Sequence, residues 1–168
     1  MEKFKVLAHN NPDRVISRWL SLLYVEKEQY ESIVGQLGLS KLTGRVFGQN
    51  GESLSGGEKQ RISLARFLLK SNFDFFVLDE PFTAMDAILE AQCAALLRRK
   101  IAGKPGMIIT HKIHLAETLS NKIVYISNGR VEASGSAGEL VAGCASYRNL
   151  RDTYFANVLK ERDPTPSP

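Results

Sequence analysis

Two short stretches of the chain combine residue types that suit phosphate chemistry. The first is the run LSGGEKQR from Leu54 to Arg61, in which a serine and a glutamate stand three positions apart, as in a capping box at a helix start. Gly56 and Gly57 carry no side chains, so free N–H groups of the first helical turn can approach an anion. The second stretch is FFVLDEP from Phe75 to Pro81, an apolar run that ends in two adjacent carboxylates. Together the two stretches predict a nucleotide-binding site.

The two carboxylates, Asp79 and Glu80, follow an apolar run from Phe73 to Leu78 that predicts a central strand covered on both faces. Open α/β sheets bind their ligands at the carboxyl ends of strands. Adjacent strand residues point to opposite sides, so the two acids should have different roles. One would hold Mg²⁺ through water, and the other would orient or deprotonate an attacking water. The alternative is a solvated turn with a helix-capping acid.

His111 follows the next apolar strand, Met107 to Thr110, at the equivalent edge of the expected sheet. A histidine at this edge would be placed to contact a terminal phosphate or the attacking water, although a lone histidine is usually structural. His9 and His114 lack such a position, and we interpret both as structural.

The elements that must position these residues follow from the spacing of apolar side chains. The sequence predicts helices over residues 13–23, 26–37, 55–70, 86–101 and 147–161, a short helix ending at 119, and strands over 4–8, 73–78, 107–110, 122–127 and 130–134. Asn128-Gly129 predicts a tight hairpin, and Ser136 with Glu139 predicts a second capping box. Helices dominate the first seventy residues and strand–helix alternation the next seventy. This order predicts an α/β fold in which a helical subdomain precedes part of a sheet.

The composition is that of one soluble globular domain, with 168 residues, 43% hydrophobic and 24% charged residues, and a net charge of +4. The densest basic cluster comprises Arg98, Arg99, Lys100 and Lys104. We interpret it as a solvated helix end rather than a nucleic-acid site, because cations favour the C-terminal helix dipole and no aromatic residues interleave with them. The two cysteines are far apart and predict reduced thiols in a cytosolic protein. Apolar runs are too short to span a bilayer, so membrane association would come through a partner.

The ordered motifs resemble those of the ATP-binding-cassette (ABC) ATPases. Leu54 to Arg61 resembles the signature motif, and Phe75 to Pro81 looks like the Walker B motif with its catalytic glutamate. Thr83 to Asp86 resembles the D-loop, and Thr110-His111 the switch histidine. The order and spacing of the four motifs agree over about residues 13–155, with phrasing most like exporter-type cassettes.

The resemblance implies that ATP is shared across a head-to-tail pair of ATPase domains. The start of the signature helix would contact the γ-phosphate of an ATP held by the opposite subunit. The ATP-binding residues implied on this chain are Ser55, Gly56, Gly57 and Gln60.

The remaining motifs imply the catalytic and interface residues. Asp79 would bind Mg²⁺ through water, and Glu80 would be the general base. His111 would be the γ-phosphate switch, and Asp86 would bridge the dimer interface.

The resemblance also implies a partial P-loop NTPase core with an α-helical subdomain. The expected segments are a remnant strand and Q-loop region (1–12), the helical subdomain ending in the signature helix (13–72), the C-terminal half of the α/β core (73–150), and a C-terminal helix with a disordered tail (151–168). The 168 residues contain no G-x-x-x-x-G-K-S/T run, and no Q-loop glutamine, for which Asn10 is a poor positional match. We therefore expect an exposed apolar sheet edge and face, and no ATP hydrolysis by the isolated chain.

The expected partners are a second ABC ATPase domain that supplies the P-loop, in a homo- or heterodimer, and a transmembrane transporter domain met by residues 13–42. This places the chain in the cytoplasm, peripheral to the membrane, with no nucleic acid bound. One alternative is a non-catalytic or regulatory module that completes a partner's ATP site. Another is a fragment of a chromosome-maintenance or DNA-repair ATPase, which the absence of heptad repeats before the signature and the modest charge disfavour.

Overall fold

A computed structural model of the chain describes residues 3–5, 24–43 and 53–162. The described residues belong to two compact units, one ending at Ile109 and the other beginning at Thr110. The predicted helix over 13–23 and the C-terminal tail lie outside the described residues. The predicted four-segment division of the chain stays a prediction.

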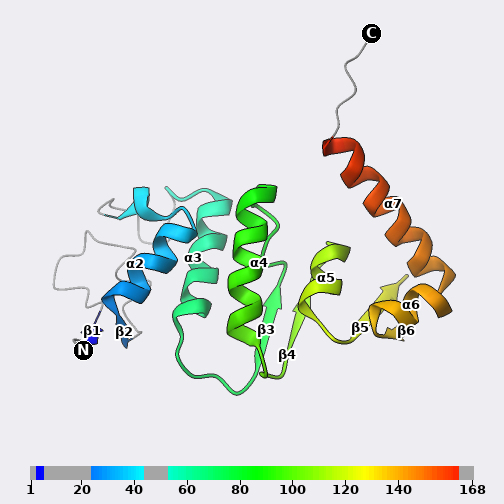
Figure 1. The fold of residues 1–168 in the computed structure, drawn as a ribbon, viewed down its shortest axis with the longest axis horizontal. Helices are drawn as coiled ribbons and strands as arrows, with labels where there is room; N and C mark the ends of the chain where they lie inside the picture. The colour runs from blue at the N-terminus through cyan, green and yellow to red at the C-terminus, as the bar shows by residue number, and fades with distance from the viewer. Residues whose placement is uncertain (1–2, 6–23, 44–52, 163–168) are drawn as a thin grey trace, which may run out of the picture. The chain divides into compact units, whose positions relative to one another are not determined.

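The first unit opens with a short antiparallel pair of strands, β1 (Lys3–Lys5) and β2 (Tyr24–Glu26). Helix α2 (Lys27–Gln36) follows directly and confirms the helix predicted over 26–37 (Figure 1). Gly38 adopts a φ of 64°, a left-handed conformation that glycine accepts without a steric penalty, and this ends the helix.

The signature stretch forms helix α3 (Gly56–Leu69), as predicted. A single 3₁₀ turn, η1 (Ser40–Leu42), precedes it along the chain. The inner face of α3 is buried, because apolar residues recur at helical spacing on that side. These buried residues are Ile62, Leu64, Ala65, Leu68 and Leu69.

The sheet of the first unit has two parallel strands, β3 (Phe76–Asp79) and β4 (Gly106–Ile109), joined through helix α4 (Ala87–Ile101). Parallel pairing through a helical crossover confirms the predicted α/β arrangement. The ring of Phe76 occupies the space that a Cβ at Gly106 would need, so the β4 strand begins with glycine for a packing reason.

One face of this sheet is open among the described residues. Val77 lies opposite Met107 in the register, and Ile109 follows two residues later on the same face. These three side chains are 53%, 50% and 47% exposed, whereas Phe76 on the other face is buried. The prediction that both faces of the strand are covered is therefore wrong for the described part of the chain. The expected exposed apolar face is present.

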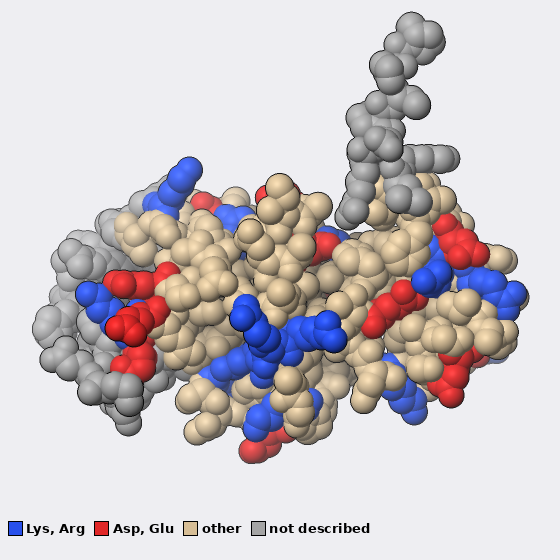
Figure 2. Space-filling model, viewed as in Figure 1, with Lys and Arg blue, Asp and Glu red and all other residues tan. Residues whose placement is uncertain are grey.

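A basic cluster lies at the end of the first unit opposite the carboxyl ends of the strands. In the view of Figure 2, Lys and Arg side chains gather over the C-terminal end of α4. The ammonium groups of Lys100 and Lys104 lie 5.9 and 5.8 Å from the ring centroid of Phe73, and Lys100 donates to the Lys70 carbonyl oxygen at 2.6 Å. Burial lowers the pKa of Lys100. Arg98, Arg99 and Lys104 are exposed, as the predicted solvated helix end requires. Lys100 is half-buried beside Phe73, an aromatic ring that the sequence interpretation missed.

The second unit packs a hairpin against helices. Its elements are α5 (Ile113–Leu119), β5 (Ile123–Ser127), β6 (Arg130–Gly135), α6 (Ala137–Gly143) and α7 (Ala145–Arg162). Asn128 and Gly129 have φ values of 50° and 73°, as a tight two-residue hairpin turn requires, and the predicted hairpin is confirmed.

The second unit contains a hydrophobic cluster centred on four buried residues. They are Ile113, Leu140, Cys144 and Tyr147. Ser136 forms the predicted capping box with Glu139 at the start of α6.

Both cysteines of the chain are free and buried, in agreement with reduced thiols. Across the described residues, no helix combines the length and the apolar character needed to cross a membrane.

Candidate functional site

The start of helix α3 has the geometry of an anion-binding helix terminus. The Glu58 N–H donates to Ser55 Oγ at 3.2 Å, and the Ser55 N–H donates to Glu58 Oε2 at 2.7 Å, so the predicted capping box is confirmed. Oγ of Ser55 acts here as an acceptor, so its own hydrogen stays available for donation. The N–H groups of Gly56 and Gly57 have no intrahelical acceptor, because the first turn of a helix leaves its donors unpaired. These donors suit a phosphate oxygen.

The two signature glycines have different surroundings. A Cβ at Gly57 would lie 3.1 Å from the Ala84 carbonyl oxygen and 3.5 Å from its Cβ. A Cβ at Gly56 would meet nothing within 4 Å. Gly57 therefore lets the helix start lie directly on the loop that follows the acid pair, whereas Gly56 keeps the outer side open for a ligand.

The acid pair lies where β3 ends, as predicted. Asp79 is the last residue of the strand and is exposed, next to Ile109 of β4. Glu80 leaves the strand in a left-handed conformation, with a φ of 44°, and its N–H donates to the Ile109 carbonyl oxygen at 2.9 Å. The Thr83 hydroxyl lies 3.3 Å from Glu80 Oε2. The two carboxylates are thus separated by a change of backbone conformation as well as by strand alternation.

Gln60 on α3 contacts the main chain of this turn at both polar atoms of its side chain. Its Nε2 donates to the carbonyl oxygen of Glu80, and its Oε1 accepts from the Ala84 N–H at 2.8 Å. The sequence placed Gln60 with the ATP-binding residues, and that role stays a prediction. These two contacts could not be predicted from sequence spacing, because Glu80 and Ala84 lie twenty and twenty-four positions after Gln60.

Asp86 is the N-cap of α4. Its Oδ1 accepts from the N–H groups of Ile88 and Leu89 at 3.1 and 2.9 Å, which accounts for an acid at this position within the chain itself. Its predicted role at a dimer interface stays a prediction.

His111 belongs to the second unit, whereas all the other predicted site residues belong to the first. It is exposed and precedes the start of α5 by two residues. Next to it, the Lys112 N–H donates to Thr110 Oγ1 at 3.1 Å. The structure therefore brings the signature helix and the acid pair together and describes the histidine on a separate unit.

A polar network between α5 and α7 was not predicted. Glu117 on α5 accepts from the Tyr147 hydroxyl at 3.2 Å and from Arg151 Nε at 2.8 Å, both on α7. His114 Nδ1 lies 2.5 Å from the Tyr154 hydroxyl, in agreement with the structural interpretation of this histidine. In the sequence, this network was indicated only by the polar residues of α5 at helical spacing.

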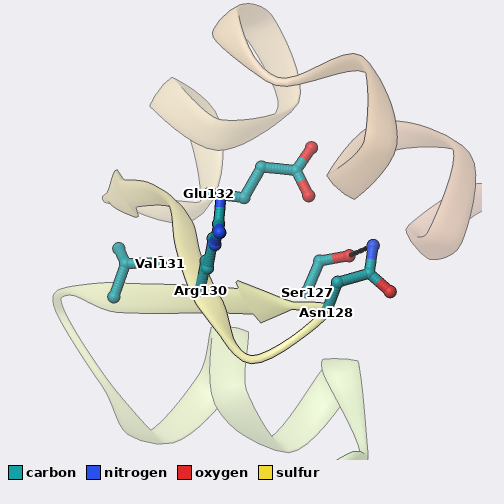
Figure 3. A pocket seen from close by; sticks show the side chains of 5 residues that line it. All are labelled: Ser127, Asn128, Arg130, Val131 and Glu132. Atoms are coloured by element: carbon teal, nitrogen blue, oxygen red, sulfur yellow. Dashed lines mark hydrogen bonds between the residues drawn. The ribbon is translucent and has the colours of Figure 1, made fainter.

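The hollow drawn in Figure 3 lies at the turn of the β5–β6 hairpin, away from every predicted site residue in sequence. Its lining residues are Ser127, Asn128, Arg130, Val131 and Glu132. Asn128 Nδ2 donates to Ser127 Oγ at 3.4 Å, and Glu132 accepts from Ser146 of α7. The polar groups of the hollow are thus partly engaged in holding the hairpin.

The acid pair fits a magnesium ion that keeps most of its water. Within the described residues, no three His, Cys, Asp or Glu side chains gather as a ready metal cage. Magnesium bound to a nucleotide commonly needs only one or two carboxylates besides phosphate oxygens and water. The exposed Asp79 carboxylate at the strand end suits this mode.

Comparisons with known proteins point to one family. The family model described as "ABC transporter" matches residues 2–83, a span that includes the signature stretch and the acid pair. The chain is 32% identical over 126 residues to the thiamine import ATP-binding protein ThiQ of Vibrio parahaemolyticus, which covers 73% of this chain and 51% of the relative. It is 37% identical over 108 residues to the β-(1→2)glucan export ATP-binding/permease protein NdvA of Nitrobacter winogradskyi. That match covers 64% of this chain and 17% of the relative.

A solved structure shows the same fold. A bacterial Atm1-family ABC exporter with ATP bound matches with a TM-score of 0.71 and 21% identity, over 88% of this chain and 28% of that chain. The chain spans about half the length of ThiQ and a smaller share of the exporters. The relatives include both an import and an export protein, so they do not set a direction of transport.

Proposed function

The chain belongs to the ABC transporter family of ATP-binding domains, and from this membership we propose that it forms part of the ATP-hydrolysing subunit of a transporter. It would supply the signature motif, Walker B acids, D-loop and switch histidine to an ATP site shared with a second ATPase domain. The observation that carries the proposal is the direct packing of the capped α3 start against the turn that bears the acid pair.

The start of α3 would bind the γ-phosphate of an ATP held by the partner domain. The Ser55 hydroxyl and the N–H groups of Gly56 and Gly57 are donors on an exposed helix end, and the helix dipole favours an anion there. Gln60 is left out of these contacts because both of its polar side-chain atoms bond the main chain.

The acid pair would serve this chain's own ATP. Asp79 would hold Mg²⁺ through water, and the ion would neutralise charge on the phosphates. Glu80 would accept the proton of the attacking water, and the Thr83 hydroxyl beside its Oε2 would orient the carboxylate. His111, on the second unit, would contact the γ-phosphate.

The P-loop would come from residues beyond these 168, on a longer form of the chain or on another polypeptide. The open sheet face formed by Val77, Met107 and Ile109 supports this proposal, because a parallel sheet is normally covered on both faces. We further propose a transmembrane partner that contacts residues 13–42. This partner would place the chain on the cytoplasmic side of a membrane. We propose no nucleic-acid partner.

The proposal is tested by measuring ATP hydrolysis with the chain alone and mixed with a cassette segment that carries G-x-x-x-x-G-K-S/T. We expect turnover only in the mixture, and none when the P-loop lysine of the added segment is replaced. Turnover by the chain alone would overturn the shared site. A mixture that associates but neither binds nor hydrolyses ATP would overturn the ATPase function.

A non-catalytic module that completes a partner's ATP site is the second candidate. It is favoured by the absence of a G-x-x-x-x-G-K-S/T run from the 168 residues. The two candidates differ in whether Glu80 is needed for turnover.

A further inference from the structure

We propose that Gln60 is a positioning residue that joins the phosphate-binding start of α3 to the turn that carries Glu80, and that it is not a ligand of the nucleotide. The inference rests on the proposed function, because it takes Ser55 to Gly57 as the phosphate contacts and Glu80 as the general base. We call the two hydrogen bonds from the Gln60 side chain to the main chain of Glu80 and Ala84 the clamp. The clamp is a property of the chain and can be tested without ATP.

The hydrogen bonds of Gln60 leave its amide badly placed for a phosphate. Its oxygen could only repel a phosphate oxygen, and it already accepts the Ala84 N–H at 2.8 Å. Its nitrogen, the one atom that could donate to phosphate, donates to the Glu80 carbonyl oxygen. The side chain is half-buried between α3 and the turn rather than directed at solvent.

The turn needs such a partner because Glu80 has an uncommon backbone conformation. Its φ of 44° is one that a residue other than glycine keeps only when its surroundings hold it. The Glu80 carbonyl oxygen receives Gln60 Nε2 and lies 3.2 Å from Thr83 Oγ1. Holding this peptide group fixes the direction in which the Glu80 carboxylate leaves the strand.

The same side chain ties the turn to the start of α3. Gln60 lies one helical turn after Gly56, and Gly57 packs on Ala84, so the first two turns of α3 contact the loop at two points. A displacement of the helix start is therefore passed to the Glu80 turn. In a head-to-tail pair, α3 would contact the partner's ATP while Glu80 acts on this chain's own, so Gln60 would couple the two ATP sites.

Three variants separate the clamp from a ligand role. Gln60→Leu removes both hydrogen bonds at nearly constant volume. Gln60→Glu keeps an acceptor for the Ala84 N–H but sets a second oxygen against the Glu80 carbonyl oxygen. Gln92→Glu is the matched control, because Gln92 is exposed on α4.

The first measurement is amide hydrogen exchange at Ala84 in the 168-residue chain without nucleotide. We expect exchange about tenfold faster in Gln60→Leu, the change that corresponds to losing one ordinary hydrogen bond, with Gln60→Glu and Gln92→Glu close to the unaltered chain. If Gln60→Leu does not fold, the test of the clamp is the ATP turnover of Gln60→Glu in the mixture with the P-loop segment. Unchanged exchange at Ala84 in folded Gln60→Leu would overturn the clamp, whatever the ATPase activity.

The second measurement is ATP turnover and ATP affinity in the mixture with the P-loop segment. We expect kcat to fall about tenfold or more in both Gln60 variants, while the ATP dissociation constant stays within about twofold, because a positioning residue acts on the transition state. Weakened ATP binding with unchanged kcat would overturn the proposal in favour of a ligand role. If the unaltered mixture shows no turnover, the proposed function fails, and the Ala84 exchange still decides the clamp.

Discussion

Gly57 lies so close to Ala84 that a Cβ at Gly57 would be 3.1 Å from the carbonyl oxygen of Ala84. The two residues lie at the start of α3 and in the loop after β3, respectively, so their contact sets how closely the signature helix approaches the acid pair. Glycine at this position is thus favoured by packing within the chain, in addition to any role toward phosphate.

This contact predicts different effects for the two adjacent glycines. Gly57→Ala should lower the free energy of unfolding by about 1 kcal/mol or more, because the loop must shift to admit the methyl group. Gly56→Ala is the control, since its Cβ would meet nothing within 4 Å, and it should be neutral or stabilising by about 0.5 kcal/mol. Urea unfolding of both variants provides the comparison. Equal stabilities would show that the loop yields without cost.

Replacing the proposed general base should abolish turnover while sparing ATP binding. We expect Glu80→Gln to reduce kcat by about 10²-fold to 10⁴-fold in the mixture with the P-loop segment, because the amide cannot accept the proton of water. The same variant should accumulate an ATP-bound pair, detectable as a larger species by size-exclusion chromatography. Unchanged turnover would support the non-catalytic alternative for this chain.

The open face of the β3–β4 sheet should be needed for association with the P-loop segment. Val77→Glu should weaken complementation by the P-loop segment about tenfold or more, because a charge would be buried in an apolar contact. Ile88→Glu is the matched control, since Ile88 is also an exposed apolar residue of the first unit but lies on α4. Stability of the isolated chain should change by less than about 0.5 kcal/mol for the control. Equal loss of complementation in both variants would argue against the sheet face as the contact.

Tyr147 should make the protein sensitive to alkaline pH. Burial raises its pKa from 10.0 to about 12, helped by the negative charge and hydrogen bond of Glu117 and opposed by Arg151. Because the folded-state pKa is the higher one, the stabilisation is complete below pH 10 and is lost as the pH rises toward 12.

Ultraviolet absorbance of tyrosinate provides the measurement. One of the five tyrosines should ionise near pH 12 in the folded chain, and Tyr147→Phe should remove that step. The stability of Tyr147→Phe should also fall less steeply between these pH values. A titration in which Tyr147→Phe leaves the highest step in place would contradict the assignment.

Much of the local structure followed from the sequence, because capping and turn chemistry act over a few neighbouring residues. Ser55 with Glu58 predicted the start of α3, and Asn128-Gly129 predicted the hairpin, and both are confirmed. The parallel pairing of β3 with β4 also followed from the apolar runs on either side of α4. The short strand β2 was missed, since its pairs with β1 run from Lys5–Tyr24 to Lys3–Glu26, separations in sequence that lie far beyond any local pattern.

The sequence alone determined which groups are available for chemistry. They are an anion-binding helix start, two adjacent acids at a strand end, and a histidine after the next strand. What only the tertiary structure decided was how these residues are held. The Gln60 amide bridges Glu80 and Ala84, Gly57 lies on Ala84, and Glu80 adopts a left-handed backbone conformation. Such contacts join residues brought together by packing, and a hydrogen bond across twenty positions leaves no periodic trace in the chain. The open face of the sheet was decided in the same way, because coverage depends on which other segments pack there and not on the apolar run itself.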